Sequence, residues 1–289
     1  MGWEVLVAEL RLITWNIAHA RGPHRRSTRA DCERTLDGIA EVLRREEPHV
    51  VALQEVDRAS TSSGGFDHLD RLAERAELPH RLHGEHLALT VGRTRWLAGT
   101  ALLSARPWLR SRSAPFGCVW RDDKGWVAGT LGFDGLEVEV FSVHLDFLNP
   151  RVRRRQARRL LSQLCGQTAV VAGDLNTPSE GGALGELVSD RLRLAGPPVA
   201  TFPSGRPRLC LDRVLVPASV QVREVRVLDD RWSDHRAVRV DLTVLPVTAR
   251  GPDEGVTSVT GAAAMGINSM RRGDWQRGHS NSEPPSCGD

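Results

Sequence analysis

Polar residues that can bind a metal ion or move a proton stand at the ends of apolar, strand-like segments. The apolar segments are residues 12–15, 50–53, 140–143, 169–172 and 237–244. The polar residues beside them are Asn16, Glu55, His144, Asp174, Asn176, Asp234 and His235. Strand ends gather on one rim of a sheet, so residues distant in sequence can meet there. The pattern therefore predicts one shared site.

The residue types indicate what this site could do. Glu55, Asp174 and Asp234 carry hard oxygen ligands, which together with asparagine amides suit Mg²⁺ better than a soft metal. Two histidines beside such a cluster can transfer protons and stabilise charge in phosphoryl transfer. Each residue taken singly fits an ordinary turn, strand end or cap. Their joint occurrence in order favours the functional interpretation.

The elements that position these residues follow from the hydrophobic pattern. Apolar residues at helical spacing predict helices over residues 32–45, 69–76 and 152–164. Strands are predicted over residues 10–17, 50–56, 99–103, 126–133, 136–145, 168–175, 211–216, 220–228 and 237–244. The helices are interspersed irregularly among adjacent strand pairs. We therefore expect an α+β sandwich with helices outside two sheets, not a regular βαβ array.

Composition excludes several classes of protein. The 289 residues include 39 Lys+Arg and 36 Asp+Glu, for a formal charge of +3, with 40% hydrophobic and 26% charged residues. These values are those of a soluble globular protein and exclude collagen-like, coiled-coil and wholly disordered chains. The mild positive charge neither requires nor excludes a nucleic-acid partner. Lys124 is the only lysine, which we interpret as an effect of genome composition.

Compartment and domain organisation are expectations drawn from weaker features. The five cysteines are far apart and form no Cys-x-x-Cys pair, which favours a reducing cytoplasm over a disulfide framework or zinc site. No secretory signal and no apolar run of the ~20 residues that a membrane-spanning helix needs is visible. We predict a lead-in over residues 1–10, a catalytic domain over 11–245 and a disordered tail over 246–289. A cytoplasmic monomer without an obligate protein partner is expected.

Seven short blocks, in order, resemble the endonuclease/exonuclease/phosphatase superfamily. This superfamily includes pancreatic-type deoxyribonucleases, exonuclease III-type repair enzymes, inositol phosphatases and sphingomyelinases. The blocks are residues 14–17, 51–57, 99–104, 142–145, 173–178, 211–215 and 233–235. Leu53-Gln54-Glu55, Gly173-Asp174-Leu175-Asn176 and Ser233-Asp234-His235 are specific in combination. The resemblance covers residues 11–242 and implies a four-layer α/β/β/α sandwich of the deoxyribonuclease I type.

The resemblance also implies a metal site. Glu55 corresponds to the main ligand, and Asn16 and Asp234 complete or support the Mg²⁺ shell. Mn²⁺ is the expected substitute. The cation and its neighbours would offset the negative charge that gathers on oxygen during attack on phosphate.

Five residues are assigned catalytic roles by the same resemblance. His235 would remove a proton from water, with Asp212 orienting it, and His144 and Asn176 would contact the phosphate and stabilise its transition state. Asp174 would bind the nucleophilic water or a second metal. The general base stays open between His235 and Asp174.

The implied function is a Mg²⁺-dependent hydrolase of a phosphodiester or phosphomonoester, with DNA or RNA slightly favoured as substrate. A phosphatase or phosphodiesterase of small molecules or lipids is the alternative, and a non-catalytic phosphate-binding module is a remote one. Thr100 replaces the asparagine of many members and receives no role. His19 and His86 match no family position, so we expect surface or packing roles. The arginine run over residues 151–159 is interpreted as the solvated face of a helix.

Overall fold

The computed structural model describes residues 7–24, 28–117, 124–133, 135–164 and 168–246. The predicted tail, apart from Pro246, and the first six residues of the predicted lead-in lie outside the described residues. The boundaries of the catalytic domain stay a prediction. Within the described part of the chain, no helix is long and apolar enough to cross a membrane.

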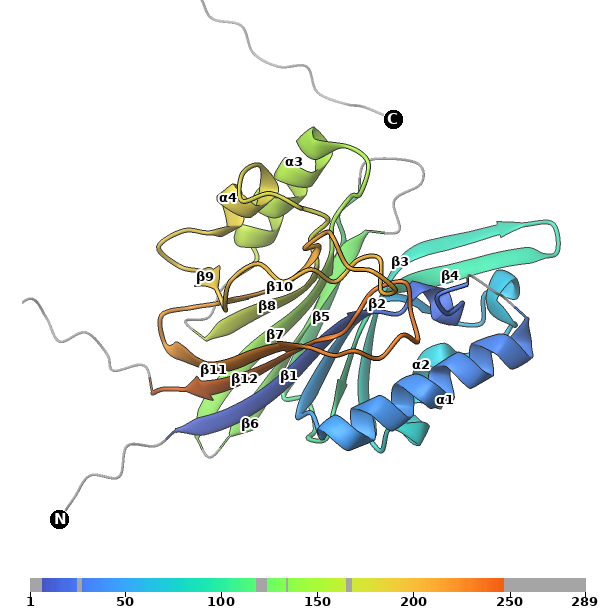
Figure 1. Cartoon of the computed structure of the whole chain (residues 1–289), viewed down its shortest axis with the longest axis horizontal. Coiled ribbons are helices and arrows are strands. Elements are labelled where there is room, and N and C mark those ends of the chain that lie inside the picture. Colours follow the sequence, from blue (N-terminus) through green and yellow to red (C-terminus); the bar gives the residue numbers. More distant parts are fainter. Residues whose placement is uncertain (1–6, 25–27, 118–123, 134, 165–167, 247–289) are drawn as a thin grey trace, which may run out of the picture. The chain divides into compact units, whose positions relative to one another are not determined.

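Two mixed sheets of six strands each form the centre of the molecule (Figure 1). Each has one parallel pair, β1–β2 or β7–β8, and its other neighbours are antiparallel. The first sheet has the order β11 (Val220–Val227), β12 (Val238–Val244), β1 (Ala8–Asn16), β2 (Val50–Asp57), β4 (Thr94–Ser104), β3 (His80–Val91). The second has the order β5 (Arg110–Pro115), β6 (Gly125–Phe133), β7 (Leu136–His144), β8 (Ala169–Asp174), β10 (Asp212–Val216), β9 (Arg193–Leu194).

A helix makes the crossover between the two strands of each parallel pair. Helix α1 (Arg29–Glu46) joins β1 to β2; the side chain of Thr28 accepts a hydrogen bond from the Asp31 amide and so caps its first turn. Helix α3 (Pro150–Leu161) joins β7 to β8 and begins with an Asn149 cap followed by proline, which suits the first helical position. The short elements are α2 (His68–Arg75), α4 (Ala183–Leu187), η1 (Ala18–Ala20) and η2 (Thr61–Ser63).

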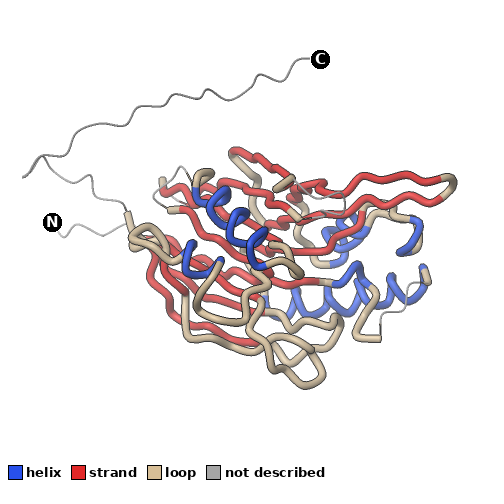
Figure 2. The backbone as a smooth tube through the Cα atoms, turned by 90° about the horizontal axis from the view of Figure 1, so that it is seen from above, coloured by secondary structure: helices blue, strands red, loops and turns tan. Residues whose placement is uncertain are grey.

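Three separate hydrophobic clusters hold four layers together. One lies between α1, α2 and the first sheet, and includes Trp15, Ile39 and Leu43. The second fills the space between the two sheets. The third packs α3 and α4 on the second sheet, around residues such as Phe141 and Leu160. Figures 1 and 2 show the helices on the outer sides of the paired sheets. The expected α/β/β/α sandwich is therefore confirmed.

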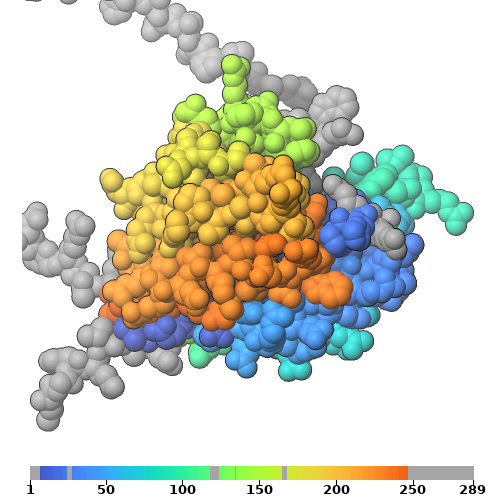
Figure 3. All heavy atoms as spheres, viewed as in Figure 1, coloured from blue at the N-terminus to red at the C-terminus, as the bar shows by residue number. Residues whose placement is uncertain are grey.

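The predicted elements are present with shifts of a few residues at their ends. Strands β3, β5 and β9, helix α4 and the short 3-10 helices η1 and η2 were not predicted. Strand β3 was missed because it is an edge strand with little buried surface, and β5 is likewise largely exposed. Helix α4 is only five residues long. The β3–β4 hairpin projects from the body of the molecule (Figure 3).

Candidate active site

Strand register brings the candidate residues to one rim of the paired sheets. Asn16 ends β1 opposite Gln54 of the parallel strand β2. His144 ends β7 opposite Asp174, the last residue of the parallel strand β8. Asp174 also pairs with Asp212, which begins the antiparallel strand β10. The convergence expected from the strand ends is thus present.

Asp174 lies at the centre of the cluster. Its Oδ2 accepts a hydrogen bond from Asn16 Nδ2 at 3.0 Å and lies 3.5 Å from His144 Nε2 and 3.8 Å from His235 Nε2. Its Oδ1 accepts the backbone amide of Asn176 at 2.9 Å. Because Asn16 belongs to the first sheet and Asp174 to the second, the site is built across the interface between the sheets.

His235 and Asp212 form a buried pair. His235 Nδ1 lies 2.8 Å from Asp212 Oδ2, and the Thr201 hydroxyl donates to the same oxygen. The Phe202 ring packs on the imidazole with centroids 4.8 Å apart. Trp15 Nε1 donates to the His235 carbonyl at 3.0 Å, which fixes the backbone just before β12. The segment at Thr201 and Phe202 is therefore part of the site.

Burial and neighbouring charges together raise the pKa values of both His235 and Asp174. Burial alone would lower the pKa of His235, but Asp212 and Asp174 outweigh it and raise this pKa to about 10. Burial raises the pKa of Asp174 to about 6, against the opposing effect of the positive charge on His235. The neighbouring carboxylates thus favour the protonated form of His235, and burial favours the protonated form of Asp174.

Lys124 is a site residue that sequence analysis missed. Its side chain is buried, with Nζ 3.0 Å from His144 Nε2 and 3.2 Å from His144 Nδ1. The pKa of His144 falls well below its usual value, first because of burial and then because of the Lys124 charge. A single lysine in an arginine-rich chain was the available signal, and we had interpreted it as a composition effect.

A bulge at the end of β2 directs Glu55 into the site. The β2–β4 register shifts between Leu53 and Val56, and Glu55 adopts a φ of 56°. Its Oε1 lies 3.9 Å from Lys124 Nζ and 4.0 Å from His144 Nε2. Burial would raise the pKa of Glu55, but the surrounding positive charges, His19 foremost, lower it overall. Glu55 is therefore held as a carboxylate.

The structure places His19, for which a surface or packing role is expected, beside Glu55 at the edge of the cluster. Its Nδ1 lies 2.7 Å from Asp57 Oδ1, and its Nε2 lies 3.4 Å from Glu55 Oε2. Burial would lower the pKa of His19, but the hydrogen bond to Asp57 and the charge of Glu55 raise it. His86, in contrast, contacts the buried Thr100 hydroxyl at 3.0 Å, as a packing residue would.

Two further candidates lie at the margin of the cluster. Asp234 is half-buried next to His235 and adds to the charge that raises the His235 pKa. The backbone carbonyl of Asp234 accepts the Ser204 amide at 2.7 Å. The amide side chain of Asn176 donates to the Leu145 carbonyl at 2.9 Å, so it is fixed beside the loop that follows His144.

The donors present fit a divalent cation. Asp174, Asp212 and His235 each offer an atom of ligand type within 4.8 Å of one another, but an imidazolium cannot bind a cation, so the two carboxylates are the donors of this group. Asp212 Oδ1 is buried and has no hydrogen-bond partner among the described residues, so it retains capacity for a ligand. Glu55 supplies a further carboxylate on the other sheet. Oxygen donors of this kind suit Mg²⁺ or Mn²⁺.

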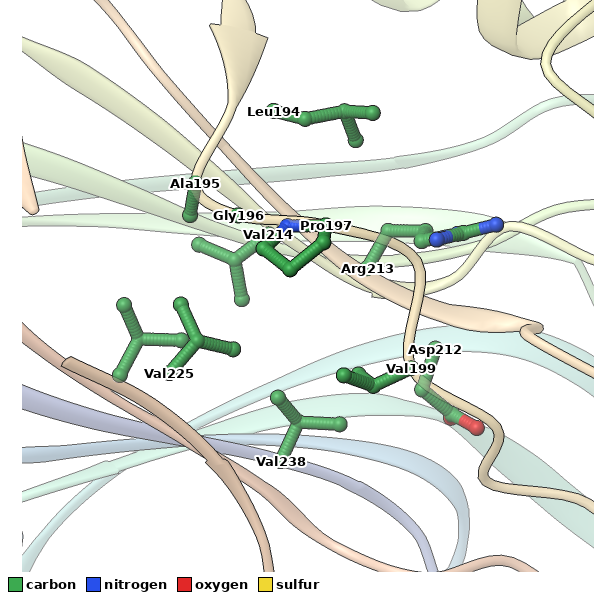
Figure 4. Close-up of a pocket in the computed structure, with 11 residues that line it drawn as sticks. Leu194, Ala195, Gly196, Pro197, Val199, Asp212, Arg213, Val214, Val225 and Val238 are labelled. Atoms are coloured by element: carbon green, nitrogen blue, oxygen red, sulfur yellow. The ribbon is translucent and has the colours of Figure 1, made fainter. Parts of the chain in front are cut away.

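A small cavity behind Asp212 has a different character. It has a volume of about 20 Å³ and is lined mainly by apolar residues of both sheets (Figure 4). Val214, Val225 and Val238 are among them, and Asp212 lies at its edge. A void of this size and lining is a packing defect between the sheets, not a substrate site.

Comparison with known proteins identifies the family of this chain. The chain matches the Endonuclease/Exonuclease/phosphatase family over residues 13–235, which is more than half of its length. This protein therefore belongs to that family, whose members are metal-dependent phosphoesterases. No curated protein shows significant sequence similarity to the chain.

Three solved structures illustrate the likeness in fold. An endonuclease/exonuclease/phosphatase from Beutenbergia cavernae is 24% identical, with a TM-score of 0.68 over 84% of this chain and 74% of that one. D. rerio TDP2 in complex with a single-strand DNA product is 17% identical, with a TM-score of 0.62 over 81% and 99%. A mannosyl-6-phosphatase from Bacteroides thetaiotaomicron has the same identity, TM-score and coverage. The fold thus accommodates a protein that binds DNA and one named for a sugar phosphate.

Proposed function

We propose that the protein is an enzyme that hydrolyses phosphoesters with a divalent cation, Mg²⁺ or Mn²⁺. The observation that carries this proposal is the position of Asp174 Oδ2, within 4 Å of Asn16, His144 and His235. A buried carboxylate amid an amide donor and two imidazoles would be costly to maintain for stability alone. Perturbed pKa values clustered in this way are typical of catalytic sites.

The protonation states of His235 and Asp174 indicate which of the two accepts a proton from water. An imidazole with a pKa near 10 is already protonated at neutral pH, so His235 cannot accept a proton from water in this state. Asp174 has a pKa of about 6 and can do so. We therefore assign Asp174 as the general base and the His235 imidazolium, held by Asp212, as the group that stabilises negative charge on the phosphate.

His144, Lys124 and Asn176 complete the phosphate side of the site. His144 is kept neutral, so it can donate one hydrogen bond to a phosphate oxygen. Lys124 adds a positive charge within 3.0 Å of His144. The Asn176 amide faces the same rim. Removing one such donor from an enzyme typically costs about 10²–10³ in rate.

Glu55 and Asn16 would hold the cation, with Asp234 in support. Once bound, the cation would supply positive charge to the phosphate oxygens and to the attacking water. This chain's own residues orient the donors: the bulge aims Glu55, and the Ser233 hydroxyl fixes the end of β1 by donating to the Asn16 carbonyl at 2.7 Å.

A nucleic acid is the substrate that we favour. Phe147 is 61% exposed, and its ring centroid lies 5.6 Å from Lys124 Nζ, so an aromatic surface adjoins the phosphate side of the site. Bases of a single strand stack on such rings. The fold neighbour bound to single-strand DNA is consistent with this choice.

A specific observation keeps a small phosphoester as the second candidate. Arg154 and Arg158 on α3, which could otherwise attract a phosphate backbone, both pair with Glu186. Arg159 donates to the Phe116 carbonyl. Fewer arginines are then available to grip a long polyanion, and the fold also occurs in a mannosyl-6-phosphatase.

The decisive assay uses purified protein with Mg²⁺ or Mn²⁺ against single-stranded DNA, plasmid DNA, RNA, and sugar and inositol phosphates. His235→Ala should lose roughly 10²–10³-fold in rate, because a group that stabilises charge on the phosphate is removed. His24→Ala is the matched control, because the His24 side chain is exposed, whereas that of His235 is buried. Hydrolysis of DNA confirms the favoured substrate, and hydrolysis of small esters alone selects the second candidate. No turnover of any substrate, or an unaffected His235→Ala, contradicts the proposal.

A further inference from the structure

A loop in an uncommon backbone conformation presents His19 to Glu55. Ala18, His19 and Ala20 have φ values of 48°, 56° and 56°, a left-handed region that residues other than glycine rarely adopt. The loop is fixed to both central strands: the Ala18 amide donates to Asn16 Oδ1, and the Ile17 amide donates to the Gln54 carbonyl, both at 3.0 Å. Backbone strain of this kind persists where the surrounding structure requires it, and it clusters at functional sites.

The two nitrogens of the His19 ring face different carboxylates, Nδ1 that of Asp57 and Nε2 that of Glu55. Nδ1 lies 2.7 Å from Asp57 Oδ1, and Asp57 is buried and also accepts the Ser63 hydroxyl. The Glu55 and Asp57 carboxylates both approach the His19 ring, Glu55 at Nε2 and Asp57 at Nδ1. Nε2 lies 3.4 Å from Glu55 Oε2, yet among the described residues it makes no hydrogen bond.

These distances fit a shared cation. Nitrogen and oxygen ligands bind divalent ions at about 2.1 Å, so two neighbouring ligands of one ion lie roughly 3–3.5 Å apart. The separation of 3.4 Å between His19 Nε2 and Glu55 Oε2 is in this range. Metal-binding histidines usually donate their other ring N–H to a carboxylate, which fixes the tautomer. Asp57 is placed to accept that hydrogen bond from Nδ1.

We propose that His19 is a ligand of the divalent cation, binding through Nε2 beside Oε2 of Glu55, and that the site therefore favours Mn²⁺ over Mg²⁺. An imidazole ligand shifts preference from Mg²⁺, which selects oxygen donors, toward transition-metal ions. The inference rests on the proposed function, because that function places the cation at Glu55. Ala18 and Ala20, which share the left-handed backbone conformation, then position the His19 imidazole beside Glu55.

The test measures metal binding directly. Calorimetric titrations with Mn²⁺ and Mg²⁺ compare the wild type, His19→Asn and the exposed control His24→Ala. Asparagine tolerates left-handed backbone, so His19→Asn preserves the loop. We expect Mn²⁺ affinity to fall roughly 10–100-fold in His19→Asn, with Mg²⁺ affinity changed much less and both unchanged in His24→Ala. Equal Mn²⁺ affinity in His19→Asn and the wild type overturns the proposal.

Pulsed electron paramagnetic resonance of bound Mn²⁺ supplies a second readout, and its isotope-labelling arm needs only the wild type. The wild type should show nitrogen coupling that changes on ¹⁵N-histidine labelling and disappears in His19→Asn. No nitrogen coupling in the wild type overturns the proposal. A parallel loss of Mg²⁺ and Mn²⁺ affinity without nitrogen coupling means that His19 only orients Glu55, which also overturns it. Phosphoester turnover by the wild type is assayed separately. If the proposed function is right, the wild type hydrolyses phosphoesters whether or not His19 proves to be a ligand.

Discussion

Asn16 donates a hydrogen bond to Asp174 across the interface between the two sheets, with Nδ2 and Oδ2 3.0 Å apart. Both residues end strands of the parallel pairs. Asn16 is the last residue of β1, which precedes helix α1, and Asp174 is the last residue of β8, which follows helix α3. The two halves of the sandwich therefore meet at the Asp174 carboxylate, the proposed general base. This contact couples the packing of the sheets to the protonation of Asp174, because a donor to the carboxylate favours its charged form.

Replacing Asn16 by alanine should affect both stability and pH dependence. Loss of a buried hydrogen bond to a charged group costs about 1–3 kcal/mol, measured by urea unfolding. The pKa of Asp174 should rise above about 6, so the acidic limb of the pH–rate profile should move to higher pH. Asn149→Ala, which removes only the α3 cap, should cost about 1 kcal/mol and leave that limb in place. An unshifted limb in Asn16→Ala argues against Asp174 as the base.

The pH–rate profile of the wild type should be bell-shaped. Asp174 acts as base only when deprotonated, so the rate should rise with pH through about 6. The His235 imidazolium is needed in its charged form, so the rate should fall as pH rises through about 10. Asp212→Asn removes the main source of that high pKa, and the alkaline limb should then move to lower pH. A profile that is flat between pH 5 and 11 would contradict this assignment.

Lys124→Met should separate the effect of charge from that of size. The Lys124 charge lowers the pKa of His144, so the variant should raise that pKa, as followed by NMR titration of the histidine. The rate should fall roughly 10²-fold or more, because a donor on the phosphate side is lost. Lys124→Arg keeps the charge and should retain a depressed His144 pKa. Wild-type turnover in Lys124→Met would remove Lys124 from the site.

A glycine in helix α1 connects packing to the site. A Cβ added at Gly38 would lie 2.2 Å from the Trp232 ring. Trp232 directly precedes Ser233 and the segment that carries Asp234 and His235. Gly38→Ala should therefore cost about 1–3 kcal/mol through overpacking and displace that segment, with a loss of activity. Gly185→Ala is the control, since its nearest contact would be an ordinary 3.6 Å. Thermal unfolding and turnover of the two variants check both effects, and a Gly38→Ala protein as stable as the wild type contradicts the first.

Much of the fold and the site could be predicted because apolar strands and their polar ends are local features. The order of strand ends identified Asn16, Glu55, His144 and Asp174. Contacts across the sheets bring them together: Asn16 donates to Asp174, and Glu55 Oε1 lies 4.0 Å from His144 Nε2. Strand β3 could not be predicted, because an exposed edge strand needs no apolar alternation and its sequence has little. Its stability comes from pairing with β4.

His19 and Lys124 could not be placed for a different reason. The position of His19 depends on a loop with left-handed backbone. Ala18 and Ala20 give no sign of this loop in the sequence, because left-handed backbone is usually indicated by glycine and neither residue is glycine. Lys124 becomes informative only when it is found buried 3.0 Å from His144. The positions of both side chains depend on long-range packing, which the spacing of residues in the sequence does not indicate.

The rate of phosphoester hydrolysis by Asp174→Asn tests the central claim most directly. Asparagine keeps the shape of the side chain but cannot accept a proton from water. With Mn²⁺ or Mg²⁺ and the substrate that the wild type turns over fastest, we predict a loss of roughly 10²–10⁴-fold in kcat and no remaining rise in rate through pH 6. A variant that folds, binds metal and retains the wild-type rate and pH profile would contradict the account.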